Sequence, residues 1–285
     1  MPKRVYPYLL IAPAMLLVTV ISLYPTVYSL WLSTQRFRRG VPEFVGLRNY
    51  VNIFTGRSFW ESLQATLIFG FAFVLVTMGL AFLLALIFNR RPRGAGVYMT
   101  IIFVPWMLSE IVSGVMFRWM FLPQFGVLQN WLGPLFGADF RFLASPAGAI
   151  GVVTGATVWR ALAFAMLLML AGLQTVPREI SEAAAIDGAA RWQVFRYVIW
   201  PLVLPTTTVT LLLLSIQAVN TAGMFLAITN GGPGRSTEVL SLYMYREAIE
   251  FFNLGYGASL SVVMLLMNVL LALVYLRTLR REALS

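Results

Sequence analysis

The sequence predicts an all-α fold, a polytopic membrane protein with six transmembrane helices and one long loop on the cytoplasmic side. Two observations predict this class. Apolar residues make up 59% of the 285 residues and charged residues only 11%, far below the roughly 25% of an ordinary soluble domain. Six stretches carry at most one charge each, and each can cross a hydrocarbon core, which needs about 20 apolar residues. We therefore expect residues 1–285 to form a single transmembrane domain.

The composition also excludes several kinds of chemistry. The chain has no cysteine and no histidine, so disulfides, thiolate metal sites and the usual general base are ruled out. We predict no catalytic residues and no metal site. The net charge is +10, but the arginines occur singly or in short groups between apolar runs. Anionic membrane lipid is therefore the expected partner of these charges, and no nucleic acid is expected.

Each predicted span rests on the spacing of charged residues. Four stretches are free of charge, namely residues 5–35, 62–89, 197–234 and 251–276. Two more hold one charge each: Glu110 lies within 94–117, and Arg160 lies within 142–177. The predicted spans cover about residues 8–32, 62–88, 97–119, 146–172, 203–228 and 256–277.

The first stretch has one alternative interpretation. Lys3 and Arg4 precede it, as in a secretory signal peptide. Its apolar run is longer than a signal core, and aromatic residues around Pro25 replace a small-residue cleavage site. We interpret it as a retained helix, which Pro13 and Pro25 can kink.

Basic residues at the span ends favour one orientation. With a cytoplasmic N-terminus, eleven basic residues lie inside and nine outside. The tight groups at 90–93 and 277–281 lie directly at helix ends, where the rule is strongest. We therefore expect both termini to be cytoplasmic and the loop at about 173–201 to be the longest inner loop.

The inner loop carries an unusual polar pattern, EAAAIDGAARWQVFRYVIWPLVLP, at residues 182–205. Pro177 suits the first turn of a helix and Gly188 a left-handed stop, which predicts a short helix over about 177–187. A second helical segment follows, and Pro201 and Pro205 mark the start of the fifth span. The small alanines at 183–185 suit a docking surface, whereas an amphipathic helix on the lipid surface is the competing interpretation.

Several stretches of the chain resemble one known family. Residues 182–188 match the EAA motif, with Glu182, Ala183 and Ala184 followed by Gly188. FVGLRNY at 44–50, LAGLQTVPREISEAAAIDGA at 170–189 and TNGGPGRSTEVLSLYMYREA at 229–248 also resemble family segments in the usual order. The chain is thus similar to permease subunits of binding-protein-dependent ABC importers of the carbohydrate-uptake type.

The resemblance implies a partner that supplies energy. The loop helix would be a coupling helix seated in a cytoplasmic ATPase, with docking residues Glu182, Ala183, Ala184, Asp187 and Gly188. This chain has no GxxxxGK[ST] loop and its single lysine is Lys3, so no cofactor is expected here, and ATP and Mg²⁺ belong on the ATPase dimer. The further partners implied are a second permease, an extracytoplasmic solute-binding protein and a sugar, at the inner membrane of a prokaryote.

Polar residues inside the spans are candidates for the translocation path, because such groups are costly in lipid. Gln217, Asn220 and Asn268 are these candidates. Gln217 and Asn220 lie on one helix face, and sugar contact and helix–helix hydrogen bonding both stay open for them.

A second pair of residues is predicted to meet inside the membrane. At about 1.5 Å per residue, Glu110 and Arg160 lie roughly 20 and 18 Å from the inner ends of their helices. A structural ion pair is favoured over substrate contact. A separation beyond about 8 Å would reject the pair, since salt bridges require contact.

The chain departs from the family pattern at Ala222 and Gly223, where many sugar permeases have Phe-Asp. The GGPG turn at 231–234 is either a tight loop or a surface for the binding protein.

We predict a sugar permease that works by alternating access. Alternatives are a permease for glycerol phosphate or another polyol, and, in other classes, a membrane-embedded enzyme or a non-transport membrane assembly subunit.

Overall fold

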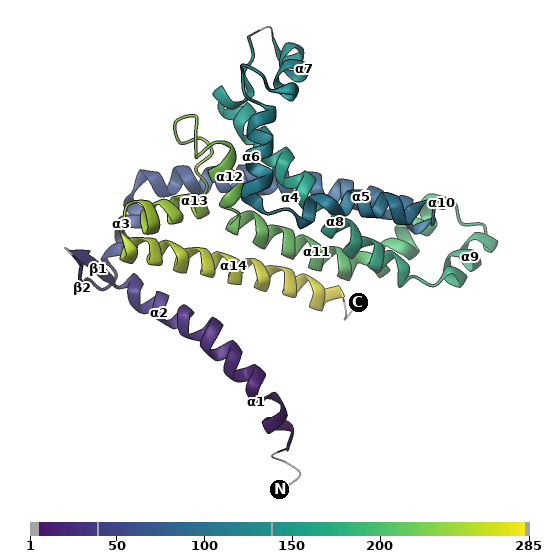
Figure 1. The fold of residues 1–285 in the computed structure, drawn as a ribbon. Helices are drawn as coiled ribbons and strands as arrows, with labels where there is room; N and C mark the ends of the chain where they lie inside the picture. Colours follow the sequence, from purple (N-terminus) through teal and green to yellow (C-terminus); the bar gives the residue numbers. More distant parts are fainter. Residues whose placement is uncertain (1–5, 39, 138, 283–285) are drawn as a thin grey trace. The chain divides into compact units, whose positions relative to one another are not determined.

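The computed structural model describes residues 6–38, 40–137 and 139–282, and most of them are helical (Figure 1). The predicted all-α class is confirmed. The chain separates into two compact units. The first comprises the chain up to Phe59 together with Tyr243–Leu266, and the second comprises Trp60–Leu242 together with the chain from Met267 onward.

The first span, in the first unit, consists of three helical pieces in one continuous stretch. These are α1 (Tyr6–Val18), the π-helical turn η1 (Thr19–Leu23) and α2 (Tyr24–Ser33). The π turn ends two residues before Pro25. Proline has no N–H and clashes with the carbonyl four residues earlier, so a wider turn ahead of it relieves the clash. Pro25 is therefore accommodated within the span.

A β-hairpin and a short helix follow the first span. Strands β1 (Gln35–Arg38) and β2 (Val41–Phe44) pair antiparallel, with Gln35 opposite Phe44 and Arg36 opposite Glu43. Helix α3 (Arg48–Thr55) is tied to the hairpin by the buried side chain of Asn49. This side chain donates to the carbonyls of Ser33 and Gln35 at 2.8 and 2.9 Å. The hairpin was not predicted from the sequence.

The same unit also holds the π turn η4 (Arg246–Glu250) and the start of α14 (Leu254–Glu282), whose later turns belong to the second unit. Gly255 lies directly against the carbonyl of Gln35, so a side chain at 255 would overlap that carbonyl. Glycine is therefore required where α14 meets the hairpin.

The second unit is built around α8 (Pro146–Gln174). Within the apolar stretch of 18 residues that qualifies α8 as a span, 61% of the residues are buried. The corresponding value for α4 (Arg57–Asn89) is 28%. The buried face of α8 is rich in alanine, glycine and threonine, and small residues let helix backbones approach closely in a membrane. Helices α5 (Ala95–Met107) and α11 (Trp200–Asn220) pack on α8.

The stretch predicted as the third span, 97–119, is not one continuous helix. Helix α5 ends at Met107, α6 (Glu110–Met120) begins at Glu110, and the two are bent by 98°. Pro105 weakens the last turn of α5 because it cannot donate. Ser109 then caps α6, since its hydroxyl accepts from the N–H of Val112 at 3.2 Å.

The helix that holds the predicted fifth span, 203–228, begins before and ends within that range. A continuous helical stretch runs over Arg191–Asn220 and comprises α10 (Arg191–Val194), the π turn η3 (Phe195–Ile199) and α11. The helix is thus continuous through Pro201, which the sequence prediction places at the start of the span. As at Pro25, a π turn ends two residues before this proline. The helix stops at Thr221, and a short helix α12 (Gly223–Ile228) follows.

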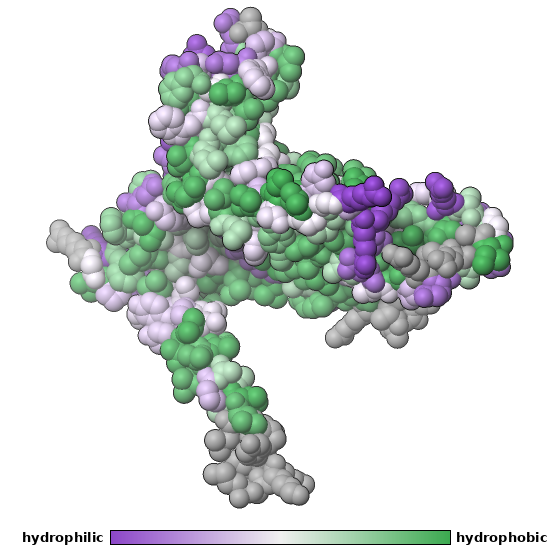
Figure 2. All heavy atoms as spheres, turned by 45° about the vertical axis from the view of Figure 1, so that its right-hand side comes forward, coloured by the Kyte–Doolittle hydropathy of each residue, from purple (hydrophilic) through white to green (hydrophobic). Residues whose placement is uncertain are grey.

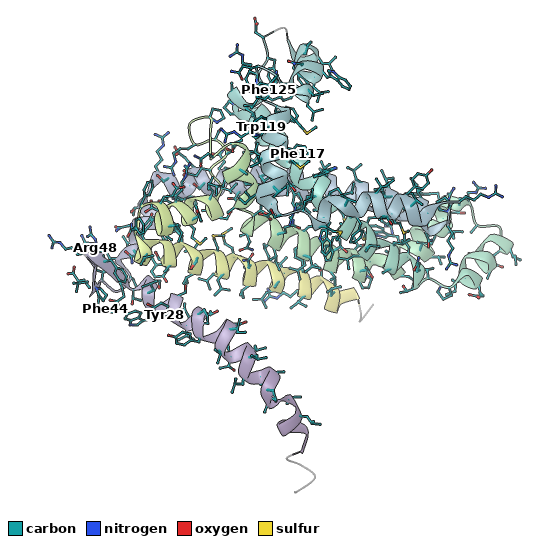
Figure 3. All side chains as sticks on the ribbon, in the orientation of Figure 1. Tyr28, Phe44, Arg48, Phe117, Trp119 and Phe125 are labelled. Atoms are coloured by element: carbon teal, nitrogen blue, oxygen red, sulfur yellow. The ribbon has the colours of Figure 1, made fainter. Side chains whose placement is uncertain are left out.

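Two further helical segments lie outside the spans. Helix α7 (Val127–Phe136) and the 3₁₀ turn η2 (Phe142–Ala144) are joined by the buried amide of Gln129. This amide donates to the carbonyl of Phe140 at 2.6 Å and accepts from the N–H of Phe142 at 3.1 Å. Trp119, near the end of α6, contacts Phe125 with tilted rings whose centroids are 5.6 Å apart (Figure 3). Helix α13 (Leu240–Tyr245) completes the described elements.

Five helical stretches among the described residues are long and apolar enough to cross a membrane, or six if the bent α5–α6 pair counts as one. The five cover Leu10–Ser33, Arg57–Asn89, Pro146–Gln174, Arg191–Asn220 and Leu254–Leu279. Hydrophobic residues cover much of the long helices on the face drawn in Figure 2. These helices provide the lipid-facing surface that the composition requires.

The contact between α6 and α12 depends on one glycine. A Cβ atom at Gly114 would lie 2.5 Å from the Cβ of Ala227 and 3.5 Å from the carbonyl oxygen of Met224. We expect Gly114→Val to destabilise the chain by about 1–3 kcal/mol through overpacking. The measurement is the thermal unfolding midpoint of the purified chain in detergent.

Gly151→Ala is the matched control, because a Cβ at this helical position of α8 would meet nothing within 4 Å. This substitution should leave the midpoint unchanged or raise it, since alanine favours helix. Equal midpoints for Gly114→Val and Gly151→Ala would contradict the close α6–α12 contact.

Candidate functional site

The predicted loop helix is present as α9 (Arg178–Ile186). It ends as the sequence predicts, because Gly188 has a φ of +84°. The N–H of Ala189 donates to the carbonyl of Ala184 at 3.0 Å, which is the six-residue bond of a Schellman motif. The N–H of Ala190 then donates to Oε1 of Gln193 at 2.7 Å and starts the next helix. Gly188 thus joins the two helices through a turn of defined geometry.

The loop presents an exposed apolar surface. Ile186 is 87% exposed and Trp192 is 67% exposed, whereas contacts of α9 with other elements are to α10 and η3. A crevice of about 400 Å³ lies between α9 and the following helix, lined in part by Ala184, Asp187 and Gly188. Ile186 is therefore not part of the core of the described residues.

The predicted docking residues share this segment. Ala183, Asp187 and Gly188 are exposed and Ala184 is half-buried. Glu182 lies in α9, but its side chain falls outside the described part of the structure. A Cβ at Gly188 would meet nothing within 4 Å, so within this chain the glycine is needed for its backbone conformation and not for space.

The structure brings Glu110 and Arg160 together. Nη1 of Arg160 lies 3.4 Å from Oε1 of Glu110, and the two side chains are 18% and 29% exposed. Nε of Arg160 also donates to the carbonyl of Leu108 at 3.0 Å. Leu108 is the residue that follows α5, so the guanidinium bridges the two sides of the break. Glu110 stands at the first position of α6, where the helix dipole favours a negative charge.

The second break, between α11 and α12, lies against the first. A Cβ at Gly223 would be 2.8 Å from Oε2 and 2.9 Å from Cβ of Glu110. The carbonyl of Thr221, which the break frees, accepts from the hydroxyl of Ser241 at 2.6 Å. Two interrupted helices therefore meet at Glu110 in the second unit.

The structure also brings two of the three predicted path residues together. The amides of Asn220 in α11 and Asn268 in α14 donate to each other, each at 3.3 Å, and Asn220 is exposed while Asn268 is half-buried. Asn220 donates in addition to the carbonyl of Ile216 at 2.7 Å. The half-buried side chain of Gln217 has no hydrogen bond within the described residues and does not join the pair.

Sequence reasoning missed the two groups that satisfy the breaks, the Leu108 carbonyl facing Arg160 and the Ser241 hydroxyl facing Thr221. Pro105 and the capping residue Ser109 were a readable indication of the first break. For Ser241 the sequence offers no comparable indication, because this residue follows Thr221 by 20 positions and approaches it only through the fold.

Known proteins match the chain closely over its length. The family described as "Binding-protein-dependent transport system inner membrane component" matches residues 77–282. The trehalose/maltose transport system permease protein MalF of Thermococcus litoralis is 34% identical over 276 residues, which cover 95% of this chain and 92% of that protein. The sn-glycerol-3-phosphate transport system permease protein UgpA of Agrobacterium fabrum is 34% identical over 273 residues, covering 95% and 93%.

A solved structure shares the fold. It is described as a crystal structure of a bacterial alginate ABC transporter in complex with an alginate pentasaccharide-bound periplasmic protein. One of its chains matches with a TM-score of 0.81 at 20% identity, over 98% of this chain and 96% of that one. Together with the family match and the relatives above 30% identity, these findings show that the chain belongs to the inner membrane components of binding-protein-dependent transport systems.

Proposed function

We propose that this chain is one permease half of an ATP-driven importer that moves a sugar inward by alternating access. Two relatives are named for trehalose and maltose and for sn-glycerol-3-phosphate, and a third, SmoG of Agrobacterium fabrum, for sulfoquinovosyl glycerol. All these solutes carry several hydroxyl groups. A hydroxyl-rich solute is therefore the substrate class that the relatives support.

The exposed helix α9 is the observation that carries the coupling part of the proposal. In an importer whose permease lacks a phosphate-binding loop, force must enter through contact with a separate ATPase. Helix α9 offers an apolar side chain, Ile186, beside small residues that allow close approach and an acidic residue, Asp187. The rigid turn at Gly188 would pass a displacement of α9 to the stretch Arg191–Asn220, which is continuous with the fifth span.

The substrate path in this proposal uses the amide pair. Asn220 is exposed and Asn268 is half-buried, both within predominantly apolar helices, and amides both donate to and accept from sugar hydroxyls. The break after Asn220 supports this role, because irregular backbone at membrane depth is tolerated where it lines a cavity or is buried in protein.

Glycerol phosphate is the second candidate substrate, and one observation favours it. UgpA is as similar to this chain, at 34% identity, as the trehalose/maltose permease is. A phosphate needs cationic or strong donor groups. Arg160 is the cation that the structure places in the second unit's broken-helix region, and it is already paired with Glu110. The neutral sugar is therefore the first candidate.

The remaining partners are a second permease, an ATPase dimer that binds ATP and Mg²⁺, and an extracytoplasmic solute-binding protein. In the first span, no residue of the apolar stretch within Leu10–Ser33 is buried. This exposure supports contact with lipid or with the second permease. The alginate transporter was solved with a periplasmic protein bound, which supports a comparable partner here. We place both termini in the cytoplasm of a prokaryotic cell.

The coupling proposal predicts the effect of a charge on α9. Ile186→Glu should abolish copurification of the ATPase subunit and reduce sugar uptake at least about tenfold, because burying an unpaired carboxylate in the interface costs more than about 1.4 kcal/mol. The measurement is the ATPase content of the purified complex and uptake by proteoliposomes.

Leu135→Glu is the control for this variant. Leu135 in α7 is 77% exposed, on an element that we place on the opposite side of the membrane. Leu135→Glu should keep the ATPase bound. Full ATPase binding and uptake by Ile186→Glu would refute coupling through α9.

The amide pair predicts a transport defect without a folding defect. Asn220→Ala and Asn268→Ala should each raise the KM for the sugar, whereas the unfolding midpoint should shift little, because interhelical hydrogen bonds in membranes contribute only about 0.6 kcal/mol on average. Uptake per assembled complex is the measurement. A lowered midpoint with unchanged uptake per complex would instead assign the pair to helix packing.

We propose that the Glu110–Arg160 pair stabilises the fold. Substitution of the two residues should lower the amount of folded protein to different extents. Arg160→Gln leaves Glu110 unpaired and weakens the bond to the Leu108 carbonyl, so it should lower the amount of folded protein more than Glu110→Gln does. The matched control is Arg118→Gln, at an exposed arginine in the last turn of α6. Normal folding of Arg160→Gln with a selective loss of transport would assign the arginine to substrate instead.

A further inference from the structure

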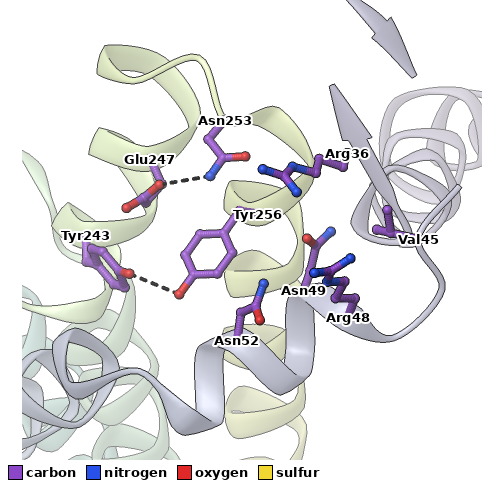
Figure 4. A pocket seen from close by; sticks show the side chains of 9 residues that line it. All are labelled: Arg36, Val45, Arg48, Asn49, Asn52, Tyr243, Glu247, Asn253 and Tyr256. Atoms are coloured by element: carbon purple, nitrogen blue, oxygen red, sulfur yellow. Dashed lines mark hydrogen bonds between the residues drawn. The ribbon is translucent and has the colours of Figure 1, made fainter. Parts of the chain in front are cut away.

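A polar pocket of about 330 Å³ lies within the first unit (Figure 4). Its walls come from β1, from α3 and from the segment between η4 and the start of α14. The side chains that matter for its chemistry are Arg36, Arg48, Asn52, Glu247, Asn253 and Tyr256. Asn220 and Asn268 do not line this pocket. Neither the sequence prediction nor the proposed function assigns the pocket a role.

The walls of the pocket are held by hydrogen bonds. Asn253 donates to Oε2 of Glu247 at 3.2 Å, and the hydroxyls of Tyr243 and Tyr256 are 3.1 Å apart. On the opposite wall the buried Asn49 fixes α3 to the hairpin through its two backbone contacts. The pocket is therefore preorganised, and a ligand need not order its walls on binding.

Three side chains at the pocket remain available. Within the described residues, the guanidinium groups of Arg36 and Arg48 have neither a hydrogen bond nor an ion pair, and the amide of Asn52 has no hydrogen bond. All three side chains are exposed. Arginine is a pure donor with five N–H groups in a planar fork, whereas an amide both donates and accepts. Two unpaired arginines at one pocket indicate a ligand that supplies acceptors.

The same pocket also contains an acceptor, the carboxylate of Glu247. A simple anion would be repelled by it, whereas a hydroxyl group donates to a carboxylate and accepts from an arginine at the same time. The ring of Tyr256 adds an apolar face of the kind that sugar rings stack on. Ligand pockets span about 300–1,000 Å³, so about 330 Å³ suits a single sugar ring and not a longer oligosaccharide.

We propose that this pocket binds the vicinal hydroxyl groups of one polyol unit, as a contact for the transported solute in addition to the Asn220–Asn268 pair. The inference rests on the proposed function for its choice of solute. Its chemistry is shared by a neutral sugar and by a glycerol phosphate. The loop that carries Arg36 and Arg48 is predicted to lie on the outer side of the membrane, where the solute would arrive.

The absence of native cysteine from the sequence permits a test by single-site labelling. Asn52→Cys in the assembled importer places one thiol at the pocket, and its rate of reaction with a membrane-impermeant maleimide is measured from outside. Maltose, trehalose and sn-glycerol-3-phosphate are the probes. A polyol at about ten times its Kd should slow labelling about tenfold by mass action, and adding Arg36→Gln in the same chain should remove the protection.

Arg38→Cys is the matched control, because Arg38 belongs to the same strand but does not line the pocket. Its labelling should not respond to any probe. Protection by the disaccharides identifies a neutral sugar, and protection by glycerol phosphate alone identifies a phosphorylated polyol; both support the inference. Equal protection by inorganic phosphate, or no protection by any probe, overturns it. Uptake by the unlabelled importer is measured in parallel, so that loss of the pocket's role and failure of the proposed transport function give different results.

Discussion

A helix that breaks within a membrane protein must find partners for the backbone groups it frees, and the second unit depends on this constraint. Unsatisfied backbone groups cost several kcal/mol in lipid. Here a carbonyl beside each break has a side-chain donor: Leu108 receives Arg160 and Thr221 receives Ser241. The donors come from α8 and α13, so the breaks are fixed by tertiary structure and not by their own sequences alone.

The limits of sequence reasoning follow from the same constraint. Charge-free stretches located the long helices because hydrocarbon thickness sets their length. They could not reveal the bend of 98° between α5 and α6, which leaves the apolar content of the stretch unchanged. The pairing of Glu110 with Arg160 was expected from their depths along straight helices. The ions do meet, but the bend invalidates the depth argument for Glu110, and burial of unpaired charge is the better reason.

The conformation of the loop was easier to predict than that of the spans, because it depends on residues that are close in the sequence. Gly188 has the left-handed backbone that the sequence predicted, and the Schellman bond needs no distant partner. By contrast, the hairpin at 35–44 was missed, because its strands are four residues each and Asn49 fixes them from outside the hairpin. The proposed docking to a partner depends on residues outside this chain, whereas the 87% exposure of Ile186 is a property of the loop itself.

The departure from the sugar-permease pattern at residue 223 has a spatial explanation. A side chain at this position would project to within 3 Å of the Glu110 carboxylate and its Cβ, so a glycine at 223 and an acid at 110 belong to one arrangement. The Glu110 carboxylate, from α6, occupies the space that a side chain at position 223 of α12 would need. An exchange at 223 would therefore disturb the ion pair, and through Arg160 the hydrogen bond to the Leu108 carbonyl. In this region the residue at position 223, in α12, therefore affects the ion pair that Glu110 of α6 makes with Arg160.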